Sequence, residues 1–497
     1  MSQETVANTA TDSAGAPIAK RVLIDGELLA LEPTFTSVNP ATGEVLGTAP
    51  DVGVEETERA IRAARRAFDE SGWATDIDMR VRCLDQLASA LREHAEELRE
   101  LTIADVGATR MLTYGNQLDA PIGIVEYYAK ILRDHPMTEE LESIEIRGET
   151  HRRWVEKEAA GVVSAIVAYN YPNQLAFAKL APALAAGCTV VLKAAPATPL
   201  ITLALGEIIA EHTDIPAGVV NILSSTSVDV GKTMTTHPEV DVVTFTGSTT
   251  VGKEIMAAAS ASLKRVFLEL GGKSALIVCD DADLQKAAQF AAFTICSHAG
   301  QGCALTTRLL VPRELHDQLA EMVGAMLDHV TFGDPSDPKM YMGPLISEQQ
   351  RDKVDGMVQR AITDGARRVR GGNRVEPGFF YSPTLLAGVD PNSEIAQEEV
   401  FGPVLVMIPY DGDDDAVAIA NNSRYGLSGG VLSENEERAI AIGRRIRTGT
   451  FSVNGGNYFA PDVPFGGYKE SGIGREMGRA GLEEFLELKS FAATVKS

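Results

Sequence analysis

The chain has 497 residues, of which 44% are hydrophobic, so it is long enough for two or three domains that each bury a core. Its 69 acidic residues outnumber its 45 basic ones, and the net charge of −24 repels phosphate backbones and anionic membrane surfaces. This balance excludes nucleic acid and a membrane surface as expected partners.

The N-terminal residues 1–19 are small and polar, and we expect them to form a disordered tail without a secretory or transit signal. The longest apolar stretch, around 175–187, is interrupted by Lys179 and falls short of the roughly 18 residues that a membrane-spanning helix needs. The five cysteines include no CxxC pair, which favours reduced thiols and a cytoplasmic protein.

Two stretches of the chain alternate between strand and helix patterns. Residues 54–101 carry Ala, Leu and Arg at three- and four-residue spacing, which predicts helices that cover a sheet. From 161 to 270, short β-branched runs alternate with helical stretches, which is typical of a parallel, doubly wound sheet. A second alternating stretch from about 275 to 465, with helices near 284–296 and 316–329, predicts a second α/β domain.

Two segments fit neither predicted sheet. Residues 142–157 interleave charges with apolar side chains, and residues 491–495 form a similar run near the C-terminus. Exposed alternating strands of this kind usually need a partner edge. Our hypothesis is that they pair between subunits.

Cys303 follows Gly300, Gln301 and Gly302, and the two glycines let the backbone bend so that the thiol faces a cleft and its own N–H points at a substrate oxygen. The alternative is a small buried hydrophobic residue, which is the usual role of a free cysteine. His298 lies shortly before Cys303, and we interpret it as a surface or capping histidine rather than as an activating base. The remaining cysteines are interpreted as packing residues or carry no functional signal: Cys83, Cys188, Cys279 and Cys296.

Glu269 and Asn170 each stand at the end of a predicted strand. A carboxylate at the carboxyl edge of a buried strand faces the crevice where open α/β sheets bind ligands, and partial burial raises its pKa toward that of a useful base. The alternative for Glu269 is a structural salt bridge to Lys273. The amide of Asn170 suits donation to a developing oxyanion, although Asn before Tyr171 and Pro172 is also common in turns.

Four further patterns carry weaker signals. Residues 245–252 turn from strand to helix through glycine and hydroxyls, which places free N–H groups and the helix dipole at a phosphate. Residues 472–474 are interpreted as a turn, because no apolar strand precedes them. The acidic run at 411–415 is interpreted as a solvated loop. The eight histidines show neither HxxxH nor HxH spacing, so no metal site is expected.

Together these segments resemble the aldehyde dehydrogenase superfamily over nearly the whole chain, from about Arg21 onward, and the combination is highly specific. The segments that carry the resemblance are AYNYP at 168–172, KAAP at 193–196, FTGSTTVG at 245–252, LELGGK at 268–273, GQGC at 300–303, EEVFGP at 398–403 and PFGGYKESG at 464–472.

The resemblance implies an α/β fold with a Rossmann-type dinucleotide-binding domain, a second α/β catalytic domain and a small β oligomerisation element. We expect a disordered tail at 1–19, the dinucleotide-binding domain at 20–137 and 160–270, the catalytic domain at 271–470, and oligomerisation strands at 138–159 and 486–497. The expected assembly is a homodimer or homotetramer.

The resemblance also implies the chemistry. Cys303 attacks the aldehyde carbon, Asn170 and the N–H of Cys303 hold the oxyanion, and Glu269 activates the water that hydrolyses the thioester. Lys193 and Gln350 are expected at the adenosine end, Ser248 at the pyrophosphate, Glu399 on the nicotinamide ribose and Phe401 beside the nicotinamide. The full set of expected cofactor contacts is Val167, Ala168, Lys193, Gly247, Ser248, Val251, Gly252, Gly271, Gln350, Glu399 and Phe401.

Two departures from the family pattern bear on specificity. Many members that prefer NAD have a glutamate where this chain has Pro196, so NAD is the first expectation and NADP is also compatible. Asn173 and Gln174 stand where apolar residues are common, which indicates a more polar substrate mouth.

Three other functions remain open at this stage. A CoA-acylating dehydrogenase typically lacks the water-activating glutamate, so Glu269 argues against it. A thiol hydrolase without a redox cofactor leaves Lys193, Glu399 and residues 245–252 unexplained. A catalytically silent relative is expected to have lost the nucleophile, whereas Cys303 is present.

Overall fold

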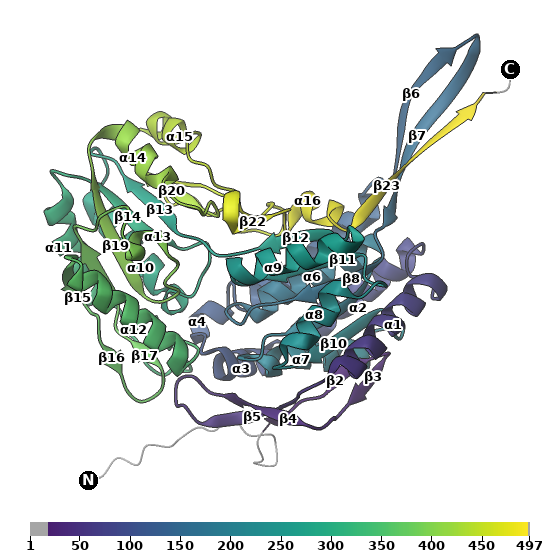
Figure 1. Ribbon diagram of the computed structural model, residues 1–497, viewed down its shortest axis with the longest axis horizontal. Helices are drawn as coiled ribbons and strands as arrows, with labels where there is room; N and C mark the ends of the chain where they lie inside the picture. Colours follow the sequence, from purple (N-terminus) through teal and green to yellow (C-terminus); the bar gives the residue numbers. More distant parts are fainter. Residues whose placement is uncertain (1–17, 496–497) are drawn as a thin grey trace.

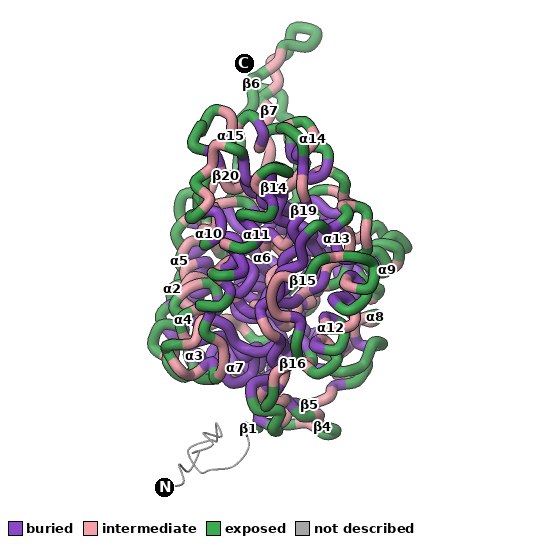
Figure 2. The backbone as a smooth tube through the Cα atoms, turned by 90° about the vertical axis from the view of Figure 1, so that its left-hand side faces the viewer, coloured by how far each residue is buried: buried purple, intermediate pink, exposed green. Residues whose placement is uncertain are grey.

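The computed structural model describes residues 18–495, and it contains two large β-sheets that are flanked by helices (Figure 1). The predicted α/β class is confirmed. Figure 2 shows buried backbone through the middle of the molecule and exposed backbone around it. Of the predicted tail, residues 1–17 lie outside the described part, whereas Ile18 and Ala19 form a short strand, so the prediction is wrong for these two residues.

The first sheet is built mainly from the strands predicted between 161 and 270. Its strands are β2 (Val22–Ile24), β3 (Glu27–Leu29), β8 (Val162–Ile166), β9 (Thr189–Ala194), β10 (Val220–Ser224), β11 (Val242–Thr246), β12 (Arg265–Glu269) and β22 (Gly472–Ile473). They follow the order β22-β12-β11-β8-β9-β10-β2-β3, and the strands from β12 to β10 are parallel. Continuous β-branched runs form these central strands because both of their faces are covered.

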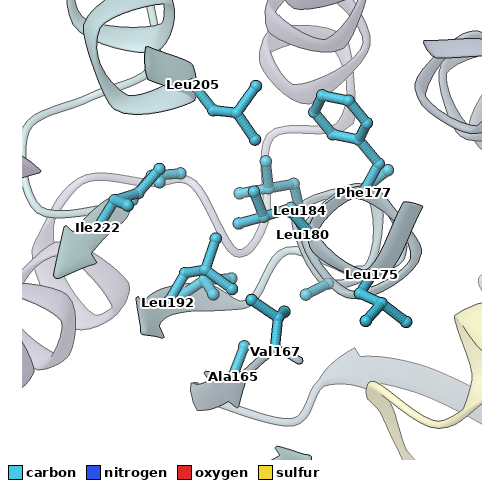
Figure 3. Close-up of a cluster of buried hydrophobic side chains, with 14 of the residues drawn as sticks. Ala165, Val167, Leu175, Phe177, Leu180, Leu184, Leu192, Leu205 and Ile222 are labelled. Atoms are coloured by element: carbon cyan, nitrogen blue, oxygen red, sulfur yellow. The ribbon is translucent and has the colours of Figure 1, made fainter. Parts of the chain in front are cut away.

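Helices connect the parallel strands of this sheet. They are α6 (Pro172–Ala186), α7 (Pro199–His212), α8 (Val228–Thr236) and α9 (Thr249–Ala259). Every residue of α6 is buried, and its sequence is apolar on all sides apart from Asn173, Gln174 and Lys179. In Figure 3, the apolar side chains of β8, β9 and β10 meet those of α6 and α7: Ala165, Leu192 and Ile222 lie toward Leu180, Leu184 and Leu205.

The strand order places a switch point beside β8. The chain runs outward from β8 through β9 to β10, and then returns to the other side of β8 with β11 and β12. Open α/β sheets bind ligands outside the carboxyl ends of the strands at such a point. The residues that leave β8 and β11 there are Val167, Ala168, Gly247 and Ser248.

Residues 472–474, predicted to be a turn, contribute an edge strand instead. β22 pairs antiparallel with the end of β12, and Gly472 lies opposite Glu269. The pairing joins segments that are far apart in the sequence, so a two-residue strand of this kind leaves no local apolar pattern. Its effect is to fix the edge of the sheet where Glu269 stands.

The second sheet confirms the second α/β unit. Its strands are β13 (Ser274–Val278), β14 (Thr306–Pro312), β15 (Arg367–Arg370), β18 (Thr384–Ala387), β19 (Val404–Tyr410), β20 (Gly429–Leu432) and β21 (Ser452–Val453), in the order β15-β18-β19-β14-β13-β20-β21. Its helices are α10 (Leu284–Cys296), α11 (His316–Leu327), α12 (Glu348–Thr363), α13 (Glu394–Gln397), α14 (Gly412–Asn421) and α15 (Glu436–Gly443). A small pair, β16 (Arg374–Val375) and β17 (Phe380–Tyr381), and the helix α16 (Gly478–Glu483) complete this part of the chain.

The acidic run at 411–415 begins helix α14, whereas a loop was predicted there. Asp413, Asp414 and Asp415 lie in the first turn, where carboxylates interact favourably with the helix dipole. Arg438 and Arg445 form ion pairs with Asp413 and Asp414. The run is therefore a helix start held by two arginines.

The N-terminal part covers the first sheet. A small sheet consists of β1 (Ile18–Ala19), β4 (Thr34–Val38) and β5 (Val45–Pro50), and the helices that follow are α1 (Val54–Glu70), α2 (Ile77–Glu93), α3 (Ala95–Val106), α4 (Arg110–Thr113) and α5 (Asp119–Asp134). The periodicity between 54 and 101 predicted the first three of these helices. Leu84, Leu87, Leu91 and Leu98 are all buried, as their spacing requires.

A third sheet projects from the body of the molecule (Figure 1). It consists of β6 (Thr138–Ile146), β7 (Glu149–Ala159) and β23 (Leu486–Thr494), in the order β23-β7-β6. The two segments that fitted neither predicted sheet thus pair with each other within one chain, and Trp154 stacks on Phe491 at 5.0 Å between ring centroids. Their pairing with another subunit stays a prediction.

Candidate active site

A cavity of about 490 Å³ brings together residues from both large sheets. All three predicted catalytic residues line it: Cys303, Glu269 and Asn170. These side chains come from the loop before β14, the end of β12 and the loop after β8, respectively. Segments 133 residues apart, from 170 to 303 in the sequence, thus meet at the carboxyl edge of the first sheet, where the switch point predicts a ligand.

Asn170 is held both by its side chain and by its backbone carbonyl. Its Nδ2 donates to the carbonyl oxygen of Gln301 at 2.8 Å, and its own carbonyl oxygen accepts from Nε2 of Gln117 at 2.8 Å. An amide nitrogen carries two hydrogens, so one remains after the contact with Gln301. The side chain is therefore fixed against the loop that carries Cys303. A residue that only formed a turn would not need this contact.

The loop before Cys303 has an unusual backbone. His298, Ala299 and Gly300 have φ values of 47°, 50° and 71°, so three successive residues adopt the left-handed region. Nε2 of Gln301 donates to the carbonyl oxygens of His298 and Pro344, both at 3.2 Å. The bend that was expected from the glycines is present, but it begins two residues before Gly300.

Among the five cysteines, Cys303 is half-buried and the other four are buried. Cys279 and Cys296 lie in the apolar core of the second sheet, as predicted. This difference in exposure leaves Cys303 as the cysteine whose sulfur borders a cavity.

Gly271 and Gly272 follow Glu269 directly, and each has its own reason to lack a side chain. A Cβ on Gly272 would lie 2.3 Å from the carbonyl oxygen of Cys303, and a Cβ on Gly271 would lie 2.7 Å from Oε2 of Glu399. The N–H of Gly272 donates to Oε1 of Glu399 at 2.9 Å. The glycine pair thus lets three predicted site segments approach one another.

Replacing Gly272 by alanine is expected to displace the Cys303 carbonyl, because that oxygen belongs to the backbone and has little freedom to move. Overpacking of this kind costs about 1–3 kcal/mol of unfolding free energy. Urea denaturation and the alkylation rate of Cys303 measure the two effects. Gly231→Ala is the matched control, because a Cβ there meets nothing within 4 Å. Wild-type stability and thiol reactivity in Gly272→Ala would contradict the close approach.

Glu269 is buried, at 2% exposed, and neither of its carboxylate oxygens has a hydrogen-bond partner among residues 18–495. Burial raises the pKa of this carboxyl well above its usual range, and the nearby charge of Glu476 raises it further. The salt bridge to Lys273, the alternative from the sequence, is absent: Nζ of Lys273 is also without a partner in the described part of the chain. Glu269 is therefore a buried group with a high proton affinity, as a general base near neutral pH requires.

A buried ion pair lies beside Glu269, and the sequence did not reveal it. Nζ of Lys179, on α6, donates to Oε1 of Glu476, and Glu476 lines the same cavity. The side chains are 0% and 3% exposed. One signal for this pair was present in the sequence: Lys179 is a single charge inside an otherwise apolar run. A buried charge needs a partner, so Lys179 indicates that an acidic residue lies nearby.

The thiol of Cys303 is protonated at neutral pH in this form of the protein. Burial raises its pKa above the ordinary value of 9.0, and the carboxylates of Glu269, Glu399 and Glu476 raise it further.

His298 differs from the surface or capping histidine that was predicted. It is 1% exposed, and its ring lies 5.1 Å from that of Tyr171 in an edge-to-face arrangement. Burial lowers its pKa to about 4, so the ring is neutral near pH 7. The correction follows from the left-handed backbone at 298–299, which turns the side chain into the protein.

The residues expected to hold a dinucleotide divide into two groups. Seven of the eleven line the cavity: Ala168, Gly247, Ser248, Gly271, Gln350, Glu399 and Phe401. Four are not part of its lining: Val167, Lys193, Val251 and Gly252. Lys193 still lies at the same edge of the sheet, because the N–H of Val167 donates to its carbonyl oxygen at 3.3 Å.

This arrangement fits a dinucleotide. The hydroxyl of Ser248 accepts from the N–H of Val251 at 3.4 Å and begins helix α9 beside the switch point, where a helix N-terminus favours a phosphate. Lys193 is 7% exposed, and its Nζ contacts the carbonyl oxygen of Ala194 at 3.3 Å. Burial lowers the pKa of Lys193 to about 8. A buried ammonium with so weak a partner suits the hydroxyls of a ribose.

Gln350 lies with Phe401. Its Nε2 donates to the carbonyl oxygens of Val400 and Phe401 at 3.1 and 2.8 Å. The ring of Phe401 lies edge-to-face against Tyr169 at 5.9 Å, and its backbone has a positive φ of 60°. Gln350 therefore holds the strained loop of Phe401.

A polar substrate mouth was predicted from Asn173 and Gln174, but only Gln174 lines the cavity. Nδ2 of Asn173 donates to Thr102 and to the carbonyl oxygen of Gln117, at 3.0 and 2.8 Å, in the protein interior. Gln174 lines the cavity, and its Nε2 faces Sδ of Met477 at 3.4 Å. Successive helix residues point in different directions, so one of the two faces inward.

Within residues 18–495, no cluster of three or more His, Cys, Asp or Glu side chains has the arrangement of a metal site. The helices of that range also include none whose length and apolar content would let it cross a membrane.

Comparison with known proteins assigns the family. The model of the aldehyde dehydrogenase family matches residues 30–491. The putative aldehyde dehydrogenase DhaS of Bacillus subtilis is 38% identical over 479 residues, which are 95% of each chain. The 3-succinoylsemialdehyde-pyridine dehydrogenase of a Pseudomonas species is 41% identical over 464 residues, which are 91% of this chain and 94% of that one.

Solved structures agree. Betaine aldehyde dehydrogenase of Staphylococcus aureus in complex with NAD+ has a TM-score of 0.92 at 35% identity, over 95% of this chain and 94% of that chain. An aldehyde dehydrogenase of Mycobacterium tuberculosis complexed with NAD+ has a TM-score of 0.91 at 40% identity, over 96% and 98% of the two chains. The chain therefore belongs to the aldehyde dehydrogenase family, and it is an oxidoreductase that converts an aldehyde to a carboxylic acid.

Proposed function

We propose that the protein carries out this oxidation through a thioester on Cys303, with NAD+ as the hydride acceptor. The observation that supports the proposal most strongly is the convergence of Cys303, Glu269 and Asn170 on one cavity that residues of the predicted dinucleotide site also line. A thiol, an amide donor and an unpartnered carboxylate are the groups that acyl chemistry at a carbonyl carbon requires.

Each residue has one role in this proposal. The sulfur of Cys303 forms a bond to the aldehyde carbon as its thiol proton passes to solvent water, and the remaining N–H of Asn170 stabilises the negative charge on the oxygen. The residues that line the cavity would hold NAD+ beside that carbon, and the cofactor would supply the hydride acceptor whose action turns the adduct into a thioester. Glu269 then removes a proton from water, whose oxygen attacks the thioester carbon, and the acid leaves as the thiol is restored. The charge of Glu476 supports this role, because it raises the proton affinity of Glu269.

Five residues are proposed to position the cofactor. Lys193 binds the adenosine ribose, Ser248 and the start of α9 bind the pyrophosphate, and Glu399 binds the nicotinamide ribose. The ring of Phe401 borders the nicotinamide. We place Gln350 beside it rather than at the adenosine end, where the sequence predicted it, because Gln350 donates to the Phe401 carbonyl oxygen. NAD+ is proposed over NADP+ because the relatives of known structure named above bind NAD+. Pro196 removes one carboxylate that rejects a 2′-phosphate, so the preference is expected to be modest.

This function is tested by incubating the protein with a panel of aldehydes and measuring the rise in absorbance of the reduced nicotinamide. We expect turnover with NAD+ and, at lower kcat/KM, with NADP+, and release of the free acid without added CoA. Turnover that depends on CoA would favour the acylating alternative. Ester hydrolysis with no aldehyde oxidation at all would favour the thiol hydrolase.

We also propose that the chain acts in the cytoplasm as a homodimer or homotetramer. The support is the sheet of β6, β7 and β23, whose two outer strands each keep one edge unpaired within residues 18–495, together with the five free thiols. The proposed division assigns 20–137 and 160–270 to the dinucleotide, 271–470 to catalysis, and the projecting strands to assembly. Analytical ultracentrifugation measures the number of subunits.

A further inference from the structure

The edge of the first sheet that carries Lys193 also carries a carboxylate that the proposed function does not use. Strands β9 and β10 are parallel neighbours, and their register places Lys193 beside the end of β10. The last residue of β10, Ser224, donates from its hydroxyl to the carbonyl oxygen of Pro50 at 2.6 Å and accepts at its own carbonyl oxygen from the N–H of Val52 at 3.1 Å. Asp51 stands between these two residues, so it lies at the same edge of the sheet as Lys193, one strand away.

The side chain of Asp51 is held by the segment that follows β10. Its Oδ1 accepts from the hydroxyl of Ser225 at 2.9 Å and from the N–H of Thr226 at 2.8 Å, and its Oδ2 accepts from the hydroxyl of Thr226 at 2.6 Å. A carboxylate offers about four acceptor positions, so Oδ2 keeps one for a further donor. Asp51 is only half-buried. It is therefore an oriented acceptor that is partly open to solvent.

The charges of Asp51 and Lys193 act on each other. Burial raises the pKa of Asp51, but the hydrogen bonds from Thr226 and Ser225 and the charge of Lys193 outweigh this effect, so the pKa lies below its usual value. Burial lowers the pKa of Lys193, and the charge of Asp51 opposes that fall. Asp51 is therefore ionised near neutral pH. Its negative charge lies close enough to influence whatever Lys193 binds.

The two helices that begin at this edge add further negative charge. Helix α1 begins three residues after Asp51 and has Glu55 and Glu56 in its first turn. Helix α8 begins at residue 228, directly after the segment that holds Asp51, and has Asp229 in its first turn. The N–H of Gly53 at the start of α1 already donates to Oε2 of Glu56 at 2.9 Å. A helix N-terminus favours a phosphate, but acids accompany both of these helix starts.

We propose that Asp51 selects NAD+ over NADP+: its carboxylate accepts a hydrogen bond from the 2′-hydroxyl of the adenosine ribose and repels a 2′-phosphate. The inference rests on the proposed function, since it needs that ribose at Lys193. A hydroxyl donates to a carboxylate, whereas a phosphate brings about two negative charges to the same place. Pro196 leaves the chain without the glutamate that many members preferring NAD carry, and Asp51 supplies a carboxylate from a different segment.

Isothermal titration calorimetry of NAD+ and NADP+ with the wild-type protein and Asp51→Asn tests this selection. Asparagine keeps the shape of the side chain and an oxygen that accepts from Thr226, but it removes the charge. We expect the ratio of the Kd for NADP+ to the Kd for NAD+ to fall about tenfold. Adenosine 2′,5′-bisphosphate and AMP should show the same fall, because they carry the distinguishing phosphate without the nicotinamide.

Two further readouts separate selection from a structural role. Salt screens the repulsion between charges, so the wild-type ratio should fall as KCl rises from about 20 to about 500 mM, and the ratio of Asp51→Asn should change less. The KM for NADP+ should fall in Asp51→Asn without a change in kcat, since Asp51 does not line the cavity that holds Cys303. If Asp51 only held the segment after β10, its replacement would weaken both cofactors alike and leave the ratio unchanged, which would overturn the proposal.

Asp214→Asn is the matched control. Asp214 is exposed and precedes β10, so its replacement removes the same charge at the opposite end of this strand. We expect its Kd ratio to stay within twofold of wild type. An equal fall in Asp214→Asn, or a ratio within twofold of wild type in Asp51→Asn, would overturn the selection by Asp51. A wild-type protein that binds neither cofactor would instead contradict the proposed function, so the two failures are distinguishable.

Discussion

Replacing Cys303 by alanine is expected to lower aldehyde-dependent formation of reduced nicotinamide by at least about 10⁴-fold, because no other described cysteine lines the cavity that Glu269 and Asn170 share with it. The fold should be retained, since the sulfur accepts or donates no side-chain hydrogen bond within residues 18–495 that its loss would break. Steady-state rates with saturating aldehyde and NAD+ measure the first effect, and urea denaturation measures the second.

Cys279→Ala is the control for this substitution, because Cys279 is buried in the core of the second sheet and should leave the rate per folded molecule unchanged. The raised pKa of Cys303 adds a check on the wild-type enzyme. A thiol whose pKa lies above 9.0 has less thiolate at neutral pH than free cysteine, so its alkylation by iodoacetamide should keep rising as the pH passes 9.0. Turnover retained in Cys303→Ala would reject the assignment of the nucleophile.

Replacing Glu269 by glutamine is expected to reduce steady-state turnover by about 10²-fold or more, because an amide cannot take a proton from water. The two side chains have nearly the same shape, and both carboxylate oxygens of Glu269 lack partners, so the substitution breaks no contact. Formation of the thioester does not require this base in our scheme. The first turnover should therefore persist as a burst of reduced cofactor, with at most one equivalent per site.

Stopped-flow absorbance measures the burst and the rate that follows it. Glu254→Gln is the control, since Glu254 is exposed on α9 and its neutralisation should change neither phase. A steady-state rate equal to that of the wild type would remove Glu269 from deacylation, whereas loss of the burst would place it in the earlier step.

Much of the fold was predictable because its signals are local. The apolar runs that form β8 to β12 are buried on both faces, so each can be recognised from its own residues, and α10 matches the predicted 284–296 at both ends. Helix α8 escaped prediction, because only Val230, Met234 and Thr235 of its nine residues are buried and the apolar pattern is weak. The short strands β2 and β3 depend on their neighbours in the sheet.

The site was less predictable where it depends on distant partners. Cys303, Glu269 and Asn170 stood at strand ends or in a glycine loop, which are local signals, and the structure brings all three to one cavity. The pairing of Lys179 with Glu476 spans 297 residues, and no spacing rule connects them. His298 was misjudged for a related reason: its direction is set by a left-handed backbone that the sequence does not display at a non-glycine residue.

The peptide unit of Gly272 has two neighbours, Glu399, which we propose binds the cofactor, and Cys303, which we propose is the nucleophile. Its N–H is bonded to Glu399, and its Cα packs against the Cys303 carbonyl. Because a peptide group is planar and stiff, it moves as one body. We therefore expect a displacement of the Glu399 carboxylate to reach the backbone that bears the sulfur through this single residue.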